Sequence, residues 1–133
     1  MKKVFIRLAF AALCLGLAGC ATRLPPRVVA GKMTVRTDPA VKPTRATVKL
    51  ANEVTIVLRP ARVPGYVWQI AQHNSNTLKQ VKDITTNAEG ETTVAFVTLR
   101  SGTTRVLFTL LPANNPNESQ PADVEDVQLQ IEN

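Results

Sequence analysis

The side chains that could do chemistry are few and far apart in this 133-residue chain. His73 is the single histidine, and it begins a polar run, residues 73–76, in which we expect a solvent-exposed turn. Ser75, Ser101 and Ser119 fall in expected loops, and no Gly-x-Ser-x-Gly motif surrounds any of them. The sequence has no phosphate-binding loop or dinucleotide fingerprint. We therefore expect no catalytic residue, no metal site and no cofactor, and we predict that the chain is not an enzyme.

Three acidic residues near the C-terminus, Asp123, Glu125 and Asp126, have a spacing that could suggest paired catalytic carboxylates. They precede an alternating apolar and polar run, residues 127–132, that is typical of a strand. Charged residues at the start of a strand limit its pairing with other chains. The prediction is therefore a solvated strand entry.

Cys20 offers a different chemistry, the attachment of a lipid to its thiol. Lys2, Lys3 and Arg7 form a positive start, and the apolar segment 4–17 is too short for a permanent membrane span. The following Leu-Ala-Gly-Cys resembles the lipobox of bacterial lipoproteins. The resemblance implies a signal peptide over residues 1–19 and a mature chain lipidated, with diacylglycerol and palmitate, at Cys20. An ordinary secretory signal with an incidental cysteine is the alternative.

The same resemblance implies a location. Ala21 follows the cysteine, and no aspartate stands there to retain the protein at an inner membrane. We expect an outer-membrane lipoprotein that faces the periplasm, with the membrane as a partner through its lipid anchor. Cys14 is the other cysteine of the chain and lies in the signal peptide, so the mature protein has no disulfide.

The charge of the chain is unevenly distributed. The net charge is +6, and half of it comes from the three basic residues of the signal peptide. Basic residues concentrate between residues 23 and 62, whereas residues 118–132 contain acidic residues and no basic residue. A basic protein in the cytosol would suggest nucleic acid, but export argues against that partner. The basic segment is expected near anionic headgroups or envelope polymers, or as a solvated tether.

Two regions follow the signal peptide. Residues 20–45 contain Pro25, Pro26, Pro39 and Pro43 and little periodicity, which predicts a semi-extended tether. A short edge strand at residues 31–35 stays open as an alternative. From residue 46 to 133 the chain reads as one domain.

Apolar and polar residues alternate in six runs of this domain. Turn-forming residues separate the runs, which are rich in β-branched side chains. About seven short strands and no helix predict an all-β domain, an immunoglobulin-like antiparallel β-sandwich, with an up-and-down barrel as the alternative. The six runs are residues 46–50, 54–59, 66–71, 93–98, 105–110 and 127–132.

Several segments resemble the chagasin family of immunoglobulin-like inhibitors of papain-type cysteine proteases. The strand 53–58 is followed by a proline-containing loop and then by Gly65-Tyr66-Val67-Trp68, which matches the end of the first binding loop of that family. Residues 90–96 and 102–108 resemble the strands beside its second and third loops. The resemblance covers residues 46–133 and implies a chagasin-like fold. Tyr66 and Trp68 are expected in the core, Trp68 on a central strand, and Phe96 and Phe108 pack with them.

The resemblance also implies three binding loops at one end of the sandwich. They correspond to Arg62–Gly65, to Asp83–Gly90 and to Pro112–Gln120. This chain departs from the family pattern in each loop, with an added cation at Arg62 and no aromatic residue after Pro112. The candidate partner-binding residues are Arg62, Val63, Pro64, Gly65, Asn87, Glu89, Gly90, Pro112, Asn114 and Asn115.

Two functions are compatible with these features. The first is a non-enzymatic envelope lipoprotein whose loops bind a protein, either a papain-type cysteine protease that is blocked sterically or another envelope protein. The alternative is a structural or accessory lipoprotein of an envelope assembly that inhibits no protease. No nucleic-acid partner is expected.

Overall fold

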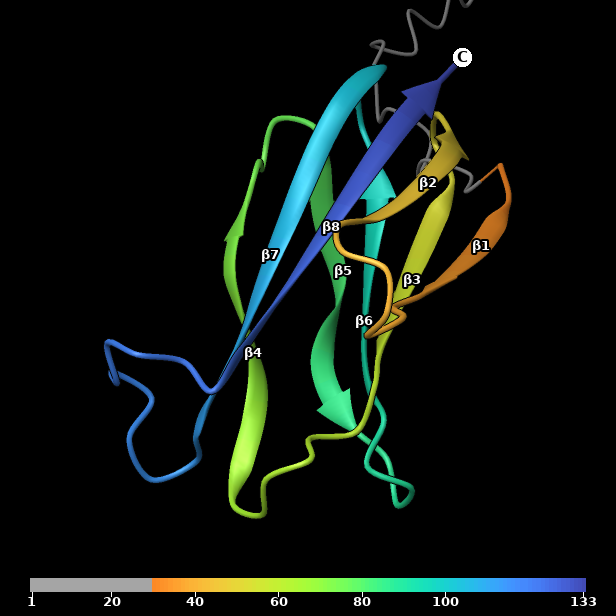
Figure 1. The fold of residues 1–133 in the computed structure, drawn as a ribbon. Coiled ribbons are helices and arrows are strands. Elements are labelled where there is room, and N and C mark those ends of the chain that lie inside the picture. Colours follow the sequence, from red (N-terminus) through yellow and green to blue (C-terminus); the bar gives the residue numbers. More distant parts are fainter. Residues whose placement is uncertain (1–29) are drawn as a thin grey trace, which may run out of the picture.

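The computed structural model describes residues 30–133, which form eight strands in two layers (Figure 1). The lipid attachment predicted at Cys20 and the signal peptide lie outside these residues. No helix that could cross a membrane occurs within residues 30–133. The strands are β1 (Lys32–Arg36), β2 (Thr44–Lys49), β3 (Glu53–Leu58), β4 (Tyr66–His73), β5 (Leu78–Thr86), β6 (Thr92–Thr98), β7 (Gly102–Pro112) and β8 (Asp123–Glu132).

The strands form two four-stranded sheets, which confirms the immunoglobulin-like β-sandwich. One sheet has the order β1-β3-β6-β5, and the other has the order β2-β8-β7-β4. The barrel alternative is wrong because the two sheets are separate. The sheets are mixed rather than purely antiparallel: β1 pairs in parallel with β3, and β2 pairs in parallel with β8.

The core lies between the sheets and follows the alternation in the sequence. In β8, Val127, Leu129 and Ile131 are buried while the intervening residues face outward. Phe96 and Phe108 are completely buried, Trp68 is almost so, and Tyr66 is half-buried against the same cluster. β4, which carries Trp68, is an edge strand of its sheet and not the central strand expected. Within residues 30–133, both sheets contribute side chains to this one core.

The domain begins earlier than residue 46, where the sequence pattern placed its start. β1 pairs along its whole length with β3, and Val35 is buried in the core. β2 begins at Thr44 and pairs with β8. Residues 32–45 are therefore part of the sandwich, and the alternative of an edge strand near residues 31–35 is the correct one. The prolines had suggested an extended tether, but pairing with β3 and β8 makes this segment part of the two sheets.

β5 is a strand that the alternation in the sequence did not reveal. It is one of the two edge strands of its sheet, and its pairing with β6 is interrupted twice by shifts in register. Lys79, Lys82 and Asp83 are exposed on it. An edge strand with bulges and charges has a weak apolar pattern, although these same features protect it from aggregation.

His73 is not in a solvent-exposed turn, as the sequence predicted, but at the end of β4. The pairing of β4 with β7 shifts between Ile70 and Gln72. This bulge moves His73 opposite the buried residue Val106, and its ring lies 5.3 Å from that of Phe96. A bulge reverses the facing of every later residue in a strand, so alternation alone misplaced this side chain.

Candidate protein-binding surface at one end of the sandwich

Three connections between strands lie at the same end of the sandwich (Figure 1). They join β3 to β4 through residues 59–65, β5 to β6 through residues 87–91, and β7 to β8 through residues 113–122. The C-terminus lies at the opposite end. All three segments expected to bind a partner therefore meet at one end, because successive strands run in opposite directions.

The three loops form a row in which the β3–β4 loop stands in the middle. On one side Gly90 of the β5–β6 loop packs so closely that a Cβ atom built on it would lie 3.3 Å from Cβ of Pro60. On the other side the backbone N–H of Ala113 donates a hydrogen bond to the carbonyl oxygen of Gly65, at 2.9 Å. The loops are thus one continuous surface and not three separate protrusions.

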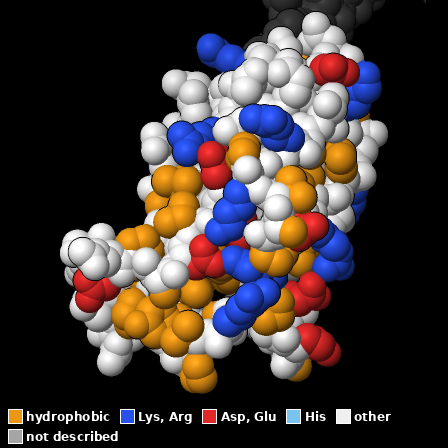
Figure 2. Space-filling view, viewed as in Figure 1, with side chains coloured by type: hydrophobic (Ala, Val, Ile, Leu, Met, Phe, Trp, Pro, Cys, Tyr) orange, Lys and Arg blue, Asp and Glu red, His pale blue; other side chains and the backbone are white. Residues whose placement is uncertain are grey.

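The middle loop presents an apolar tip beside a positive charge. Arg62, Val63, Pro64 and Gly65 are all exposed, and 42% of the surface of Val63 is accessible. Figure 2 shows hydrophobic side chains gathered at this end of the molecule. Within residues 30–133, Arg62 makes no ion pair. Gly65 has φ of +80°, a conformation that residues with a side chain rarely adopt.

The β5–β6 loop is shorter than predicted, because residues 83–86 belong to β5. Asn87 closes it: its side-chain oxygen accepts the backbone N–H of Glu91 at 2.9 Å, and its carbonyl oxygen accepts that of Gly90 at 3.1 Å. Asn87 and Glu89 are exposed, and Gly90 is half-buried against the middle loop. The loop is a compact turn whose shape its own hydrogen bonds determine.

The β7–β8 loop also contains local turns. Pro112 is the last residue of β7 and lies opposite Tyr66, so the loop itself starts at residue 113. The N–H of Asn115 donates to the carbonyl oxygen of Pro112 at 3.1 Å, and the N–H of Glu118 donates to that of Asn115 at 3.2 Å. Asn114 and Asn115 are exposed. The loop projects beyond the sandwich, to the lower left in Figure 1.

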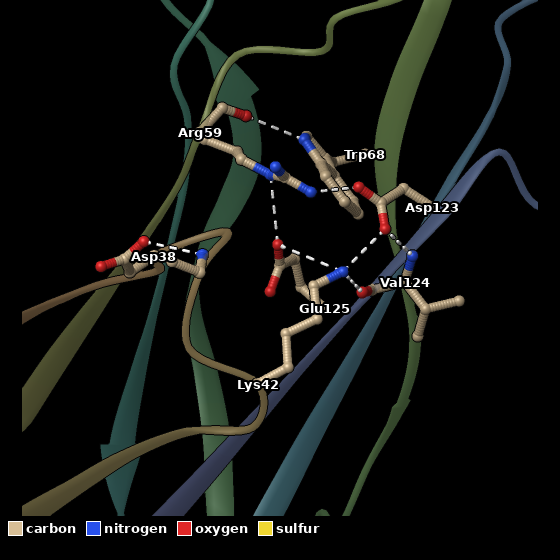
Figure 3. Close-up of polar contacts among 8 residues, drawn as sticks. Asp38, Lys42, Arg59, Trp68, Asp123, Val124 and Glu125 are labelled. Atoms are coloured by element: carbon tan, nitrogen blue, oxygen red, sulfur yellow. Dashed lines mark hydrogen bonds and ion pairs between the residues drawn. The ribbon is translucent and has the colours of Figure 1, made fainter.

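Four charged residues, which we call the base cluster, lie beneath these loops: Lys42, Arg59, Asp123 and Glu125 (Figure 3). Arg59 pairs with Asp123, and its Nε lies 3.2 Å from Oε1 of Glu125. Nζ of Lys42 lies 2.8 Å from Oδ1 of Asp123 and 4.0 Å from Oε1 of Glu125. Sequence reasoning missed this cluster, because its members come from three distant segments.

Glu125 corrects the prediction of a solvated acidic strand entry. Its side chain is fully buried, because alternation places it on the same face of β8 as Val127 and Leu129. That parity was the signal in the sequence that could have identified it. Neither of its carboxylate oxygens accepts a hydrogen bond within the described residues. Burial raises the pKa of Glu125, while Lys42 and Arg59 oppose this change.

The pKa of Asp123, in the same cluster, changes in the opposite direction to that of Glu125. Burial acts to raise its pKa, but the hydrogen bonds from Lys42 and from the N–H of Val124, together with the charges of Lys42 and Arg59, lower it overall. The base cluster therefore stabilises the ionised form of Asp123. For Glu125, in contrast, burial favours the protonated form. A group of three or more residues suited to hold a metal ion does not occur in the described part of the chain.

Trp68 connects the core to the middle loop. Its Nε1–H donates a hydrogen bond of 2.9 Å to the carbonyl oxygen of Arg59, the first residue of that loop (Figure 3). Trp68 as a whole is only 4% exposed. One residue thus holds the backbone of Arg59, whose side chain reaches the base cluster.

Comparisons with known proteins find a similar fold but no similar sequence. The sequence matches no protein-family model and no curated protein at a significant level. The cysteine protease inhibitor EhICP2 from Entamoeba histolytica has a similar structure, with a TM-score of 0.61 and 18% sequence identity over 76% of this chain and 97% of that one. The chain has a chagasin-like fold.

Two further solved structures share the fold. PbICP-C, solved in complex with falcipain-2, gives a TM-score of 0.54 and 8% identity over 75% of this chain and 99% of that one. Amebosin gives a TM-score of 0.51 and 15% identity over 76% and 98%. Each of these neighbours is covered almost completely, so the similarity in fold extends over nearly the whole of each of those chains.

Proposed function

We propose that this chain is a lipid-anchored, non-enzymatic inhibitor of papain-type cysteine proteases. The observation that carries the proposal is the continuous row of three loops at one end of a chagasin-like domain. Two of the structural neighbours support it: EhICP2 is a cysteine protease inhibitor, and PbICP-C was solved bound to falcipain-2.

The proposed mechanism is steric and needs no reactive side chain. The apolar tip, Val63 and Pro64, enters the cleft of the protease, and the two neighbouring loops rest on either side of the cleft. Apolar groups that lose contact with water in a closely packed cleft supply much of an interface's affinity. Arg62 adds a positive charge at the edge of the tip, which favours a protease with acidic residues at that position.

The location of the inhibitor is part of the same proposal. The lipobox at Cys20 supports an anchor in the outer membrane, with the domain in the periplasm. A protease there that is damaging to the cell envelope is the expected target class. An accessory role in an envelope assembly is the alternative if no protease is inhibited.

The test is an inhibition titration of residues 21–133 against papain, after circular dichroism has shown a folded β protein. We expect an inhibition constant below about 1 μM, which corresponds to a binding free energy of about −8 kcal/mol. Replacing Arg62, Val63 and Pro64 together by Gly-Ser-Gly should weaken inhibition at least tenfold.

Lys79→Ser, at an exposed position on β5, provides the control and should leave the inhibition constant unchanged. A folded parent domain that does not inhibit papain or a cathepsin-type protease would contradict the proposal. The search would then move to envelope proteins as partners of the same loops.

A further inference from the structure

The base cluster connects the two sheets directly below the binding loops. Arg59 follows β3, which belongs to one sheet, whereas Asp123 and Glu125 belong to β8 in the other sheet. Arg59 is also the first residue of the β3–β4 loop, and Asp123 directly follows the β7–β8 loop. Their ion pair therefore joins the base of one loop to the base of another.

The segment that precedes the predicted domain takes part in this connection. Lys42 lies between β1 and β2, and its ammonium group contacts Oδ1 of Asp123 and the carbonyl oxygen of Val124, at 2.8 Å and 3.0 Å. At the end of β1, Arg36 pairs with Glu91 at the base of the β5–β6 loop, at 2.7 Å. Each of the three loops thus has an ion pair at its base. The β5–β6 loop is held by Arg36 of β1, and the β3–β4 and β7–β8 loops are held by the base cluster.

Stability alone is a poor reason for such a cluster. Burying a carboxylate costs several kcal/mol, and well-packed apolar residues in place of a buried ion pair are often equally or more stable. Glu125 is buried without a hydrogen bond to either oxygen, so its geometry does not compensate this cost fully. Directional contacts between groups of fixed length do, however, restrict the separation of the segments that carry them.

We propose that Lys42, Arg59, Asp123 and Glu125 are positioning residues that fix the separation between the β3–β4 and β7–β8 loops. This inference rests on the proposed function, because the separation matters only if both loops contact one partner. A partner with a cleft of fixed width would bind more tightly to loops that are held at the matching distance, since less conformational freedom is lost on binding.

The experiment measures the separation directly. The chain from residue 21 contains no cysteine, so Val63→Cys and Asn115→Cys allow one spin label on each loop. Electron paramagnetic resonance then gives the distribution of distances between the labels. Arg59→Met combined with Glu125→Gln removes the cation and the buried negative charge together, which avoids leaving an unpaired buried charge. We expect a broader distribution of distances than in the parent, because the ion pairs of Arg59 no longer join the bases of the two loops.

The matched control is Arg105→Met combined with Asp126→Asn. This ion pair, at 2.8 Å, involves β8 as well, but it joins β8 to its neighbour β7 on the exposed outer face of one sheet and does not connect the two sheets. It should leave the distribution unchanged. Lys42→Met, which keeps both Arg59 contacts, should give a smaller broadening and serves if the double variant does not fold.

Inhibition of papain by the unlabelled variants separates the two proposals. If the parent inhibits, the Arg59 and Glu125 variant should be at least tenfold weaker while the control is unchanged. A parent that does not inhibit, with a broadened distribution in the variant, contradicts the proposed function but not the positioning. Distributions as narrow as the parent's in both base-cluster variants would overturn the positioning proposal.

Discussion

Single residues near the three loops can both pack in the core and form a hydrogen bond to the backbone of a loop. Trp68 is the clearest case, because its ring is buried and its Nε1–H holds the carbonyl oxygen of Arg59. The sequence resemblance identified Trp68 as a core residue. Its hydrogen bond could not be predicted, because the partner is a backbone atom nine positions earlier whose placement depends on the whole fold.

Glu125 provides a prediction at the same scale. Burial raises its pKa, so the folded state binds a proton at Glu125 more tightly than the unfolded chain does. The free energy of unfolding contributed by Glu125 should therefore fall as the pH rises from the ordinary glutamate pKa to the raised value. Glutamine does not titrate, so the Glu125→Gln variant lacks this pH dependence. The free energy of unfolding of the variant minus that of the parent should therefore increase as the pH rises across the same interval.

Urea unfolding at several pH values from 3 to 8 measures this difference. Gln130→Asn, at an exposed position on the outer face of the same strand, changes no titratable group and is the control; its stability relative to the parent should stay constant across the same pH values. A Glu125→Gln variant whose stability relative to the parent stays constant, or decreases, as the pH rises would contradict the direction of the pKa change.

Among the elements, six strands were predictable from alternation, whereas β5 was missed and β1 was only an open alternative; both are edge strands of the same sheet. β7 and β8 alternate in burial because one face of each strand packs against the opposite sheet, whereas β3 and β6 are buried at most of their positions. β1 and β5 are edge strands with exposed charged residues, which weaken the apolar pattern. The two parallel pairings also escaped prediction, since alternation says which face is buried but not which strand lies alongside.

The candidate site likewise has features that the sequence could predict and contacts that it could not. The positions of the three loops followed from the order of the strands and from the family resemblance. The contact of Gly90 with Pro60 and the hydrogen bond between Ala113 and Gly65 could not be predicted, because they join loops that are distant in the sequence. The base cluster required the fold for the same reason, apart from the parity of Glu125 in β8.

β1 carries the prediction at the scale of the element. Val35 is 5% exposed and packs in the core, so Val35→Ala should lower the free energy of unfolding by about 2 kcal/mol. Val41→Ala makes the same chemical change in the same segment at a side chain that is 55% exposed, and it should cost less than about 0.5 kcal/mol. Equal, small losses in urea unfolding would mean that β1 is not part of the stable sandwich in solution.

The whole molecule has two distinct ends. The N–H of Ala30 donates to the carbonyl oxygen of Ala51 in the β2–β3 turn, at the end opposite the three loops. With a lipid on Cys20, as proposed, residues 21–30 could span at most about 35 Å between the membrane and the domain. The membrane would then lie near the end that carries the β2–β3 turn, and the three loops proposed to bind a protease would point away from it.

This orientation can be tested on lipidated protein in vesicles. A donor dye placed by Arg100→Cys, in the β6–β7 turn, should transfer more energy to an acceptor lipid than a dye placed by Asn115→Cys. β7 separates the two positions and has 11 residues, which corresponds to about 36 Å along the strand. Equal transfer from both positions, or more from Asn115→Cys, would contradict the orientation. A Cys20→Ser chain should not associate with the vesicles.

The most direct test of the central claim, that the three-loop end enters the cleft of a cysteine protease, is a binding measurement with a blocked enzyme. Calorimetric titration of residues 21–133 would be done against papain and against papain whose catalytic cysteine carries a bulky covalent inhibitor that fills the cleft. We predict binding at about 1 μM or tighter to free papain and at least 100-fold weaker binding to the blocked enzyme. Equal affinity for the two forms would show that the loops bind elsewhere and would contradict the account.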